Sequence, residues 1–151
     1  CREERVRIMP GARELVRTMR AWGAQCILVS GGFHHFADPV AAEIGFHRAM
    51  ANRLAVEGDR LSGEVSGPIV DAAVKARLLA DSAADLDLAG LQTLAVGDGA
   101  NDIPMIEAAG LGVAYHAKPK AAAAADAAVR HNDLTALLYA QGVPRGQWAA
   151  D

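Results

Sequence analysis

The chain has 151 residues, of which 52% are hydrophobic and 22% are charged, and its formal net charge is −3. This composition is typical of a soluble globular protein of one domain that buries a sizeable core. The 15 lysines and arginines are spread along the sequence, so we expect no nucleic-acid partner. No apolar run approaches the ~20 residues of a membrane-spanning helix, so we expect no membrane partner either.

Two cysteines, Cys1 and Cys26, form no disulfide framework, which favours a reducing, cytoplasmic location. The sequence begins at Cys1 and not at Met. We therefore expect it to be part of a longer protein.

The first predicted helix opens at Met9-Pro10-Gly11 and closes at Gly23, with apolar residues at helical spacing between them. An apolar run over residues 26–29 then predicts a strand that ends in Ser30-Gly31-Gly32-Phe33, followed by a helix over 34–44. A hydroxyl followed by two glycines lets backbone N–H groups approach an anion, so this loop is a candidate phosphate site. A plain strand-to-helix turn explains the glycines equally well.

The next helix begins with two adjacent histidines, His34 and His35. They point in different directions on a helix and make a poor metal pair, so we interpret them as solvated or packing residues. Alternating segments over 52–67, around Glu57-Gly58-Asp59, predict a β-hairpin excursion from the main sheet. A helix is predicted over 70–84, and Lys75 lies next to its apolar face, where periodicity alone favours an ordinary solvated lysine.

Residues 93–105, TLAVGDGANDIPM, are the most informative stretch. An apolar strand runs into a turn that carries Asp98, Asn101 and Asp102, with glycines at 97 and 99. Carboxylates at the end of a buried strand suit a hard cation such as Mg²⁺. The alternative is that both acids are only turn formers and helix caps.

The remaining sequence predicts a strand over 112–115, a helix over 121–125, a strand over 127–129, a helix over 134–141 and a loose tail over 143–151. Strands that alternate with helices predict a Rossmann-like α/β fold, with a parallel sheet and helices on both faces. We expect a single domain over 1–151.

Three segments together resemble motifs of the haloacid dehalogenase superfamily, and within it the phosphoserine phosphatase family. These segments are Ser30-Gly31-Gly32-Phe33, Lys75 within VDAAVKARLL, and GDGANDIPMIEAAGLGVAYHAKPK over 97–120. The resemblance implies a haloacid dehalogenase-like core and an Mg²⁺-dependent phosphomonoester hydrolase. The implied substrate is the small molecule O-phosphoserine, hydrolysed in serine biosynthesis.

The resemblance also implies a role for each matching residue. Ser30 and Gly31 would bind the substrate phosphate, and Lys75 would neutralise charge on the phosphoryl group. Asp98 would ligate Mg²⁺, Asp102 would hold metal-bound water, and Asn101 would contact the phosphate region. Lys75, Ser30 and Asp102 are thus the candidate catalytic residues. Phosphoryl transfer relies on this kind of positioning and charge neutralisation.

One family feature is missing from these residues. The first motif, an apolar strand ending in Asp-x-Asp-x-Thr, supplies the nucleophilic aspartate and does not occur in the sequence. Asp85-Leu86-Asp87 follows both Ser30 and Lys75, and no strand precedes it, so we reject it as a nucleophile. We expect the nucleophile and the cap domain upstream, with residues 1–8 as the last turn of a cap helix, and the chain alone to be inactive.

Two alternatives stay open. One is another enzyme of the superfamily, either a phosphatase for a different phosphomonoester or a P-type ATPase phosphorylation domain. The ATPase is disfavoured because that group carries Thr-Gly-Asp where this sequence has Ser30-Gly31-Gly32. The other is a non-catalytic remnant that binds metal or phosphate, or that only fills an interface.

Overall fold

The computed structural model describes residues 6–149. The chain divides into two compact units. The first unit comprises residues 1–69 and 133–151, and the second comprises residues 70–132.

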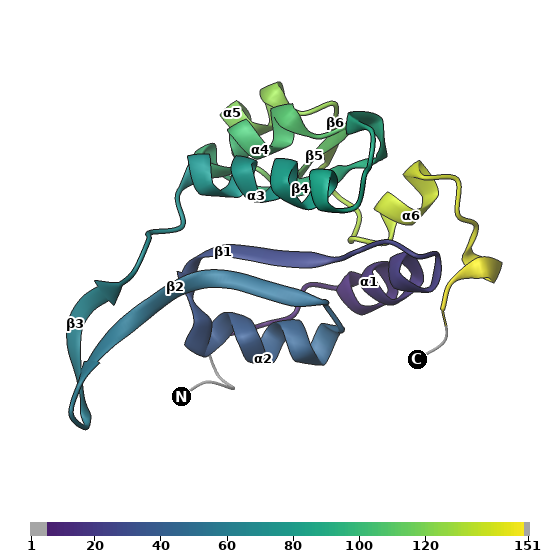
Figure 1. Ribbon diagram of the computed structural model, residues 1–151. Coiled ribbons are helices and arrows are strands. Elements are labelled where there is room, and N and C mark those ends of the chain that lie inside the picture. The colour runs from purple at the N-terminus through teal and green to yellow at the C-terminus, as the bar shows by residue number, and fades with distance from the viewer. Residues whose placement is uncertain (1–5, 150–151) are drawn as a thin grey trace. The chain divides into compact units, whose positions relative to one another are not determined.

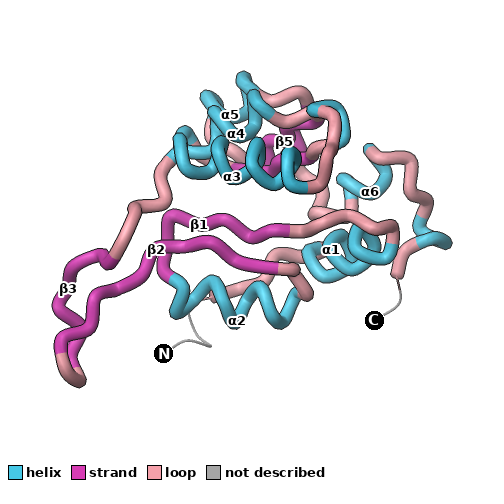
Figure 2. The backbone as a smooth tube through the Cα atoms, in the orientation of Figure 1, coloured by secondary structure: helices cyan, strands magenta, loops and turns pink. Residues whose placement is uncertain are grey.

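The first unit is built around a sheet with the strand order β1-β2-β3 (Figure 1). Strands β1 and β2 pair in parallel, and β2 and β3 form an antiparallel hairpin that extends beyond β1 (Figure 2). Its elements are α1 (Ala12–Ala21), β1 (Ile27–Phe33), α2 (His34–Ile44), β2 (Arg48–Glu57), β3 (Arg60–Ser66), α6 (Ala136–Ala140) and the short helix η3 (Arg145–Gln147).

Helices α1 and α2 of the first unit share one apolar cluster. Ala12 and Val16 of α1 and Ile44 of α2 are buried together, and Phe46 and Leu134 pack against them. Ala12 and Val16 lie four residues apart, so they share the face of α1 that turns inward. The second helix, α2, contacts both β1 and β2 and thereby supports the strand that contains Ser30, Gly31 and Gly32.

The second unit is a parallel sheet with the strand order β4-β5-β6. Helix α4 contacts β4 and β5 and also packs against α3 and α5. The elements are α3 (Ala72–Asp85), η1 (Gly90–Gln92), β4 (Leu94–Gly97), η2 (Ala100–Asp102), α4 (Ile103–Ala108), β5 (Leu111–Tyr115), α5 (Pro119–Ala124) and β6 (Ala127–Val129).

Strand β5 is the core of the second unit. Val113 and Ala114 are almost fully buried, as expected for a central strand covered on its faces. A Cβ atom at Gly112 would lie only 2.1 Å from the carbonyl oxygen of Ile106. Only glycine therefore permits α4 to pack this closely on the strand.

The predicted α/β fold with parallel strands is confirmed. The hairpin predicted over 52–67 is also present, but its first strand begins earlier, at Arg48. Residues Arg48 to Met50 pair in parallel with β1, so β2 is a strand of the main sheet that continues into the hairpin.

The C-terminal segment differs from the predicted loose tail. Val143 is only 3% exposed, and its carbonyl oxygen accepts a hydrogen bond from Trp148 Nε1. The Ala149 N–H donates to Thr18 Oγ1 of α1 at 3.0 Å. Residues 143–149 are therefore held in place by the burial of Val143 and by the hydrogen bond to Thr18 of α1.

The predicted end of a cap helix falls partly on residues 1–5, which lie outside the described residues. Residues 6–8 have no helical structure. The single-domain assignment stays a prediction. Within residues 6–149, no helix combines the length and the apolar character needed to cross a membrane.

Candidate functional site

The predicted acidic turn follows directly after strand β4. The strand ends at Gly97, and Asp98 and Gly99 link it to η2 and α4. Pro104 lies in the first turn of α4, where its missing N–H costs no helical hydrogen bond. The apolar strand and the helix that follows thus hold a short loop between two regular elements.

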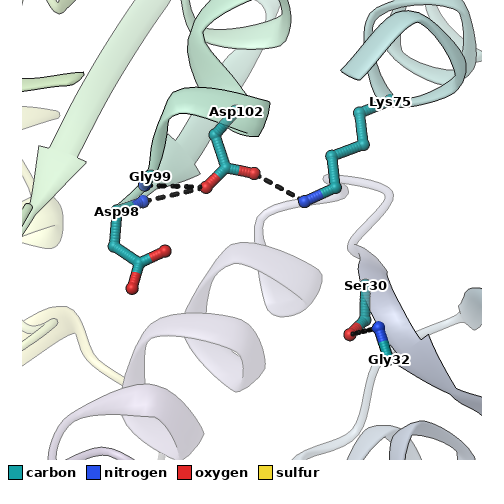
Figure 3. Close-up of polar contacts among 6 residues, drawn as sticks. All are labelled: Ser30, Gly32, Lys75, Asp98, Gly99 and Asp102. Atoms are coloured by element: carbon teal, nitrogen blue, oxygen red, sulfur yellow. Dashed lines mark hydrogen bonds and ion pairs between the residues drawn. The ribbon is translucent and has the colours of Figure 1, made fainter. Parts of the chain in front are cut away.

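Asp102 is buried and holds this loop in place through hydrogen bonds. Its side chain folds back, so that Oδ2 accepts hydrogen bonds from the N–H groups of Asp98 at 3.0 Å and Gly99 at 3.2 Å (Figure 3). The other oxygen, Oδ1, accepts from Lys75 Nζ at 2.7 Å. Both carboxylate oxygens are therefore engaged within the protein.

Gly97 is required by the close approach of Asp102. A Cβ atom at Gly97 would lie 2.4 Å from the Cβ of Asp102 and 2.7 Å from its Oδ2. The first glycine of the GDG sequence therefore makes room for the carboxylate that holds the loop.

Lys75 is only 5% exposed, whereas helical periodicity alone favoured a solvated side chain. It lies in the first turns of α3, a helix capped by Asp71, whose Oδ1 accepts from the Val74 N–H at 2.9 Å. The burial follows from the ion pair with Asp102, because a lysine is rarely buried unless its charge is compensated.

The surroundings of Asp102 keep it ionised. Burial acts to raise the pKa of the Asp102 carboxyl, but the hydrogen bond from Lys75 and those from the Asp98 and Gly99 N–H groups act in the opposite direction. Together with the positive charge of Lys75, they hold the pKa of Asp102 below its ordinary value.

Asp98 combines a fixed backbone with an exposed side chain. Its N–H donates to Asp102, and its carbonyl oxygen accepts from the Lys118 N–H at 3.0 Å. The side chain lies at the carboxyl end of β4 in contact with solvent, as does Asn101 in η2. A carboxylate presented in this way fits a hard cation that keeps several waters and is completed by a substrate phosphate.

Asp98 is the candidate carboxylate ligand for such a cation. No group of three or more His, Cys, Asp or Glu residues that could enclose a metal occurs within residues 6–149. An exposed carboxylate with no such group around it is compatible with Mg²⁺, which keeps several waters and accepts phosphate oxygens.

Ser30 and Gly31 belong to the first unit, at the end of β1. Ser30 Oγ accepts a hydrogen bond from the Gly32 N–H at 3.0 Å (Figure 3). The Gly31 carbonyl oxygen accepts from Asn52 Nδ2 at 2.8 Å. Sequence reasoning did not single out Asn52, because an amide inside a hairpin pattern carries no signal of the loop it contacts.

The second unit contains Lys75, Asp98, Asn101 and Asp102, and the first unit contains Ser30 and Gly31. The strand predicted over 26–29 continues to Phe33, so Ser30 and Gly31 lie in an irregular part of β1 and not in a loop after it. The rejected Asp85-Leu86-Asp87 sequence lies at the end of α3, where Asp87 has a left-handed backbone with φ 52°. It follows a helix and not a strand, which supports its rejection as a nucleophile.

A haloacid dehalogenase-like hydrolase family model matches residues 1–107. The chain therefore belongs to the haloacid dehalogenase-like hydrolases. It is 45% identical over 144 residues to phosphoserine phosphatase SerB2 of Mycobacterium tuberculosis. That match covers 95% of this chain and 35% of the relative.

Two solved structures agree with this placement within the phosphoserine phosphatases. A probable phosphoserine phosphatase from Vibrio cholerae, in its unliganded form, is 42% identical with a TM-score of 0.85, over 93% of this chain and 46% of that one. A phosphoserine phosphatase in its apo form is 34% identical with a TM-score of 0.83, over 90% of this chain and 68% of that one. The chain is a phosphoserine phosphatase homologue that spans about a third of the length of its M. tuberculosis relative.

Proposed function

We propose that this chain supplies the metal-binding and phosphate-binding parts of an Mg²⁺-dependent phosphatase that hydrolyses O-phospho-L-serine to serine and phosphate. The observation that carries the proposal is the buried Lys75–Asp102 ion pair beside the exposed carboxylate of Asp98. A lysine fixed in position and an acid that can bind a metal ion are the groups that neutralise charge on a phosphoryl group during its transfer.

Each residue has a proposed role. Asp98 would ligate Mg²⁺, which supplies charge neutralisation at the phosphoryl group when it is bound. Asp102 fixes the backbone around Asp98 and the ammonium group of Lys75, and it would orient metal-bound water. Lys75 and Asn101 would contact the phosphoryl group. Ser30 and Gly31 would bind phosphate oxygens through the hydroxyl and the backbone N–H.

The proposed nucleophile is an aspartate outside these 151 residues, which contain no Asp-x-Asp-x-Thr motif. Strand order supports a further strand in the complete fold. Among the described residues, β1 is an edge strand of the β1-β2-β3 sheet, and β4 is an edge strand of the β4-β5-β6 sheet. Edge strands present unpaired backbone groups that another strand can pair with. Serine biosynthesis and a cytoplasmic location belong to this proposal.

The substrate assignment is tested with the complete gene product and a panel of small phosphomonoesters, including O-phospho-L-serine, O-phospho-L-threonine and a sugar phosphate. We expect kcat/KM for O-phospho-L-serine to exceed the others by at least about tenfold, which corresponds to ~1.4 kcal/mol of differential transition-state binding. A preference for a different phosphomonoester would reject the substrate while keeping the phosphatase. No Mg²⁺-dependent release of phosphate from any of them would reject the enzyme.

A further inference from the structure

The end of β1 contains a local irregularity in its pairing with β2. Val29 pairs with Met50, and the next pair is Phe33 with Asn52. Ser30, Gly31 and Gly32 therefore lie opposite one residue of β2, Ala51. An irregularity of this kind interrupts the ladder of backbone hydrogen bonds and leaves backbone groups that need other partners.

Two side chains form hydrogen bonds with backbone groups at this interruption. Asn52 Nδ2 donates to the carbonyl oxygen of Gly31 at 2.8 Å. On the β2 side, the Ala51 N–H donates to Nε2 of His34 at 3.2 Å. One side chain from β2 and one from α2 thus replace the strand-to-strand hydrogen bonds on the two sides of the bulge.

The His34 ring is itself held in place. Because Nε2 accepts from Ala51, the ring carries its proton on Nδ1, which donates to Asp38 Oδ1 at 2.6 Å. Asp38 lies one helical turn further along α2. This pair fixes both the tautomer and the orientation of the ring.

Asn52 is 6% exposed, although an amide is a costly residue to bury. A plain structural explanation is that it only satisfies its own hydrogen bonds. However, it reaches across to a loop carbonyl whose own strand pairing is interrupted. Removing the Asn52 donor would leave that carbonyl without this hydrogen bond.

The bulge fixes the position of the Ser30 hydroxyl, which would bind phosphate in the proposed function. Ser30 Oγ accepts from the Gly32 N–H, so its own proton remains available to donate to a ligand. A Cβ atom at Gly32 would lie 3.2 Å from this oxygen, so the turn is tight around it. A shift of the Gly31 peptide would therefore move the hydroxyl as well.

We propose that Asn52 is a positioning residue for the Ser30-Gly31-Gly32 bulge, and that His34, oriented by Asp38, holds the opposite side of it. Together they keep the bulge in the shape that receives a phosphate oxyanion. This inference rests on the proposed function for its ligand, but its geometry rests on the hydrogen bonds of the first unit alone.

The test uses the complete gene product with Asn52→Leu, which keeps the size of the side chain and removes the donor, and with His34→Phe, which keeps a ring and removes the acceptor. His35→Phe is the matched control, because His35 is the exposed neighbour of His34 on α2. Backbone amide signals of Gly31, Gly32 and Ala51 are followed by NMR, with and without inorganic phosphate. The KM and kcat for O-phospho-L-serine are measured in parallel.

We expect Asn52→Leu to shift the Gly31 and Gly32 amide signals. It should also raise the dissociation constant of inorganic phosphate and the KM, each by roughly tenfold, because one buried hydrogen-bond partner is lost. The loop contacts the phosphate before and during reaction, so kcat should change much less than KM. His34→Phe should speed Ala51 amide exchange by roughly tenfold. His34→Gln, whose carbonyl can replace the acceptor, should recover part of that protection.

Unchanged Gly31 and Gly32 signals with unchanged phosphate affinity in folded Asn52→Leu would overturn the inference, as would equal effects from His35→Phe. If Asn52→Leu does not fold, Asn52→Asp removes only the N–H donors and is judged by the amide signals, because its charge would itself repel phosphate. If the parent protein does not hydrolyse O-phospho-L-serine, the proposed substrate fails. The amide signals and the phosphate titration then still decide the role of Asn52.

Discussion

Lys75 Nζ lies 2.7 Å from Asp102 Oδ1, and the two side chains are 6% and 8% exposed. The pair links α3 to the short turn that follows β4, over 27 positions of sequence. Because the second oxygen of Asp102 holds the Asp98 and Gly99 N–H groups, one carboxylate connects the lysine to the backbone of the candidate metal ligand. The organisation of the turn therefore depends on this ion pair.

Replacing Lys75 by Met should destabilise the protein. Removing one partner of a buried ion pair leaves an uncompensated charge, and we expect the free energy of unfolding to fall by about 3 kcal/mol. Urea denaturation measures this change. Lys120→Met, an exposed lysine on α5, is the control and should change stability by less than about 0.5 kcal/mol. Equal effects of the two substitutions would contradict the role of the ion pair.

A double-mutant cycle with Lys75→Met and Asp102→Asn tests whether the two side chains act together. If they do, the double variant should be less destabilised than the sum of the single variants, with an interaction energy of roughly 1–3 kcal/mol. Additive effects would show that the two residues stabilise the protein independently.

The lowered pKa of Asp102 predicts a pH dependence of stability. A carboxyl whose pKa is lower in the folded state binds its proton more readily when unfolded, so its contribution is complete above the ordinary pKa of 3.8. That contribution should disappear as the pH falls from this value through the folded pKa. The difference in unfolding free energy between the parent protein and Asp102→Asn, measured from pH 7 downward, should therefore be constant at first and shrink below about pH 4. A difference that grows with acid would contradict the prediction.

Gly97→Ala should disturb the turn without adding or removing a charge. The new methyl group would lie 2.4 Å from the Cβ of Asp102, so either the strand end or the carboxylate must move. We expect a loss of about 1–3 kcal/mol in unfolding free energy, the usual cost of overpacking. Gly90→Ala is the control, because nothing lies within 4 Å of a Cβ atom there. Thermal unfolding of the two variants should separate them, and similar melting temperatures would show that the turn adapts.

The 151 residues alone should not hydrolyse O-phospho-L-serine, because they lack the motif that supplies the nucleophile. The purified chain is first shown to be folded by circular dichroism and then assayed for phosphate release with Mg²⁺. Turnover above that of a Lys75→Met preparation would mean that a group within these residues attacks phosphorus.

Local sequence patterns were sufficient to predict most of the fold. The apolar run before Gly97 predicted β4, because this signal acts within a few residues. The start of β2 was missed because the apolar run after Arg48, Ala49 to Ala51, is too short to predict a strand by itself. Their strand structure comes from parallel pairing with β1, which is a contact between distant parts of the chain.

The candidate site could be predicted only in part. Asp98 and Asp102 stand out because acids and glycines cluster after an apolar strand. Lys75 was identified only through the family resemblance, since helical periodicity cannot show a partner 27 residues away. No sequence pattern indicated Asn52, because its hydrogen bond to the Gly31 carbonyl oxygen cannot be predicted from sequence spacing.

The proposed role of Asp98 as the Mg²⁺ ligand is tested by the Mg²⁺ dependence of O-phospho-L-serine hydrolysis, measured for the complete gene product and for its Asp98→Asn variant. Asp98 is exposed, so the variant should fold normally, and its Mg²⁺ requirement should rise at least about tenfold with a large loss of kcat/KM. Asp81→Asn, an exposed acid on α3, should behave like the parent protein. Hydrolysis that is equally fast in the Asp98 variant, or independent of Mg²⁺, would contradict the account.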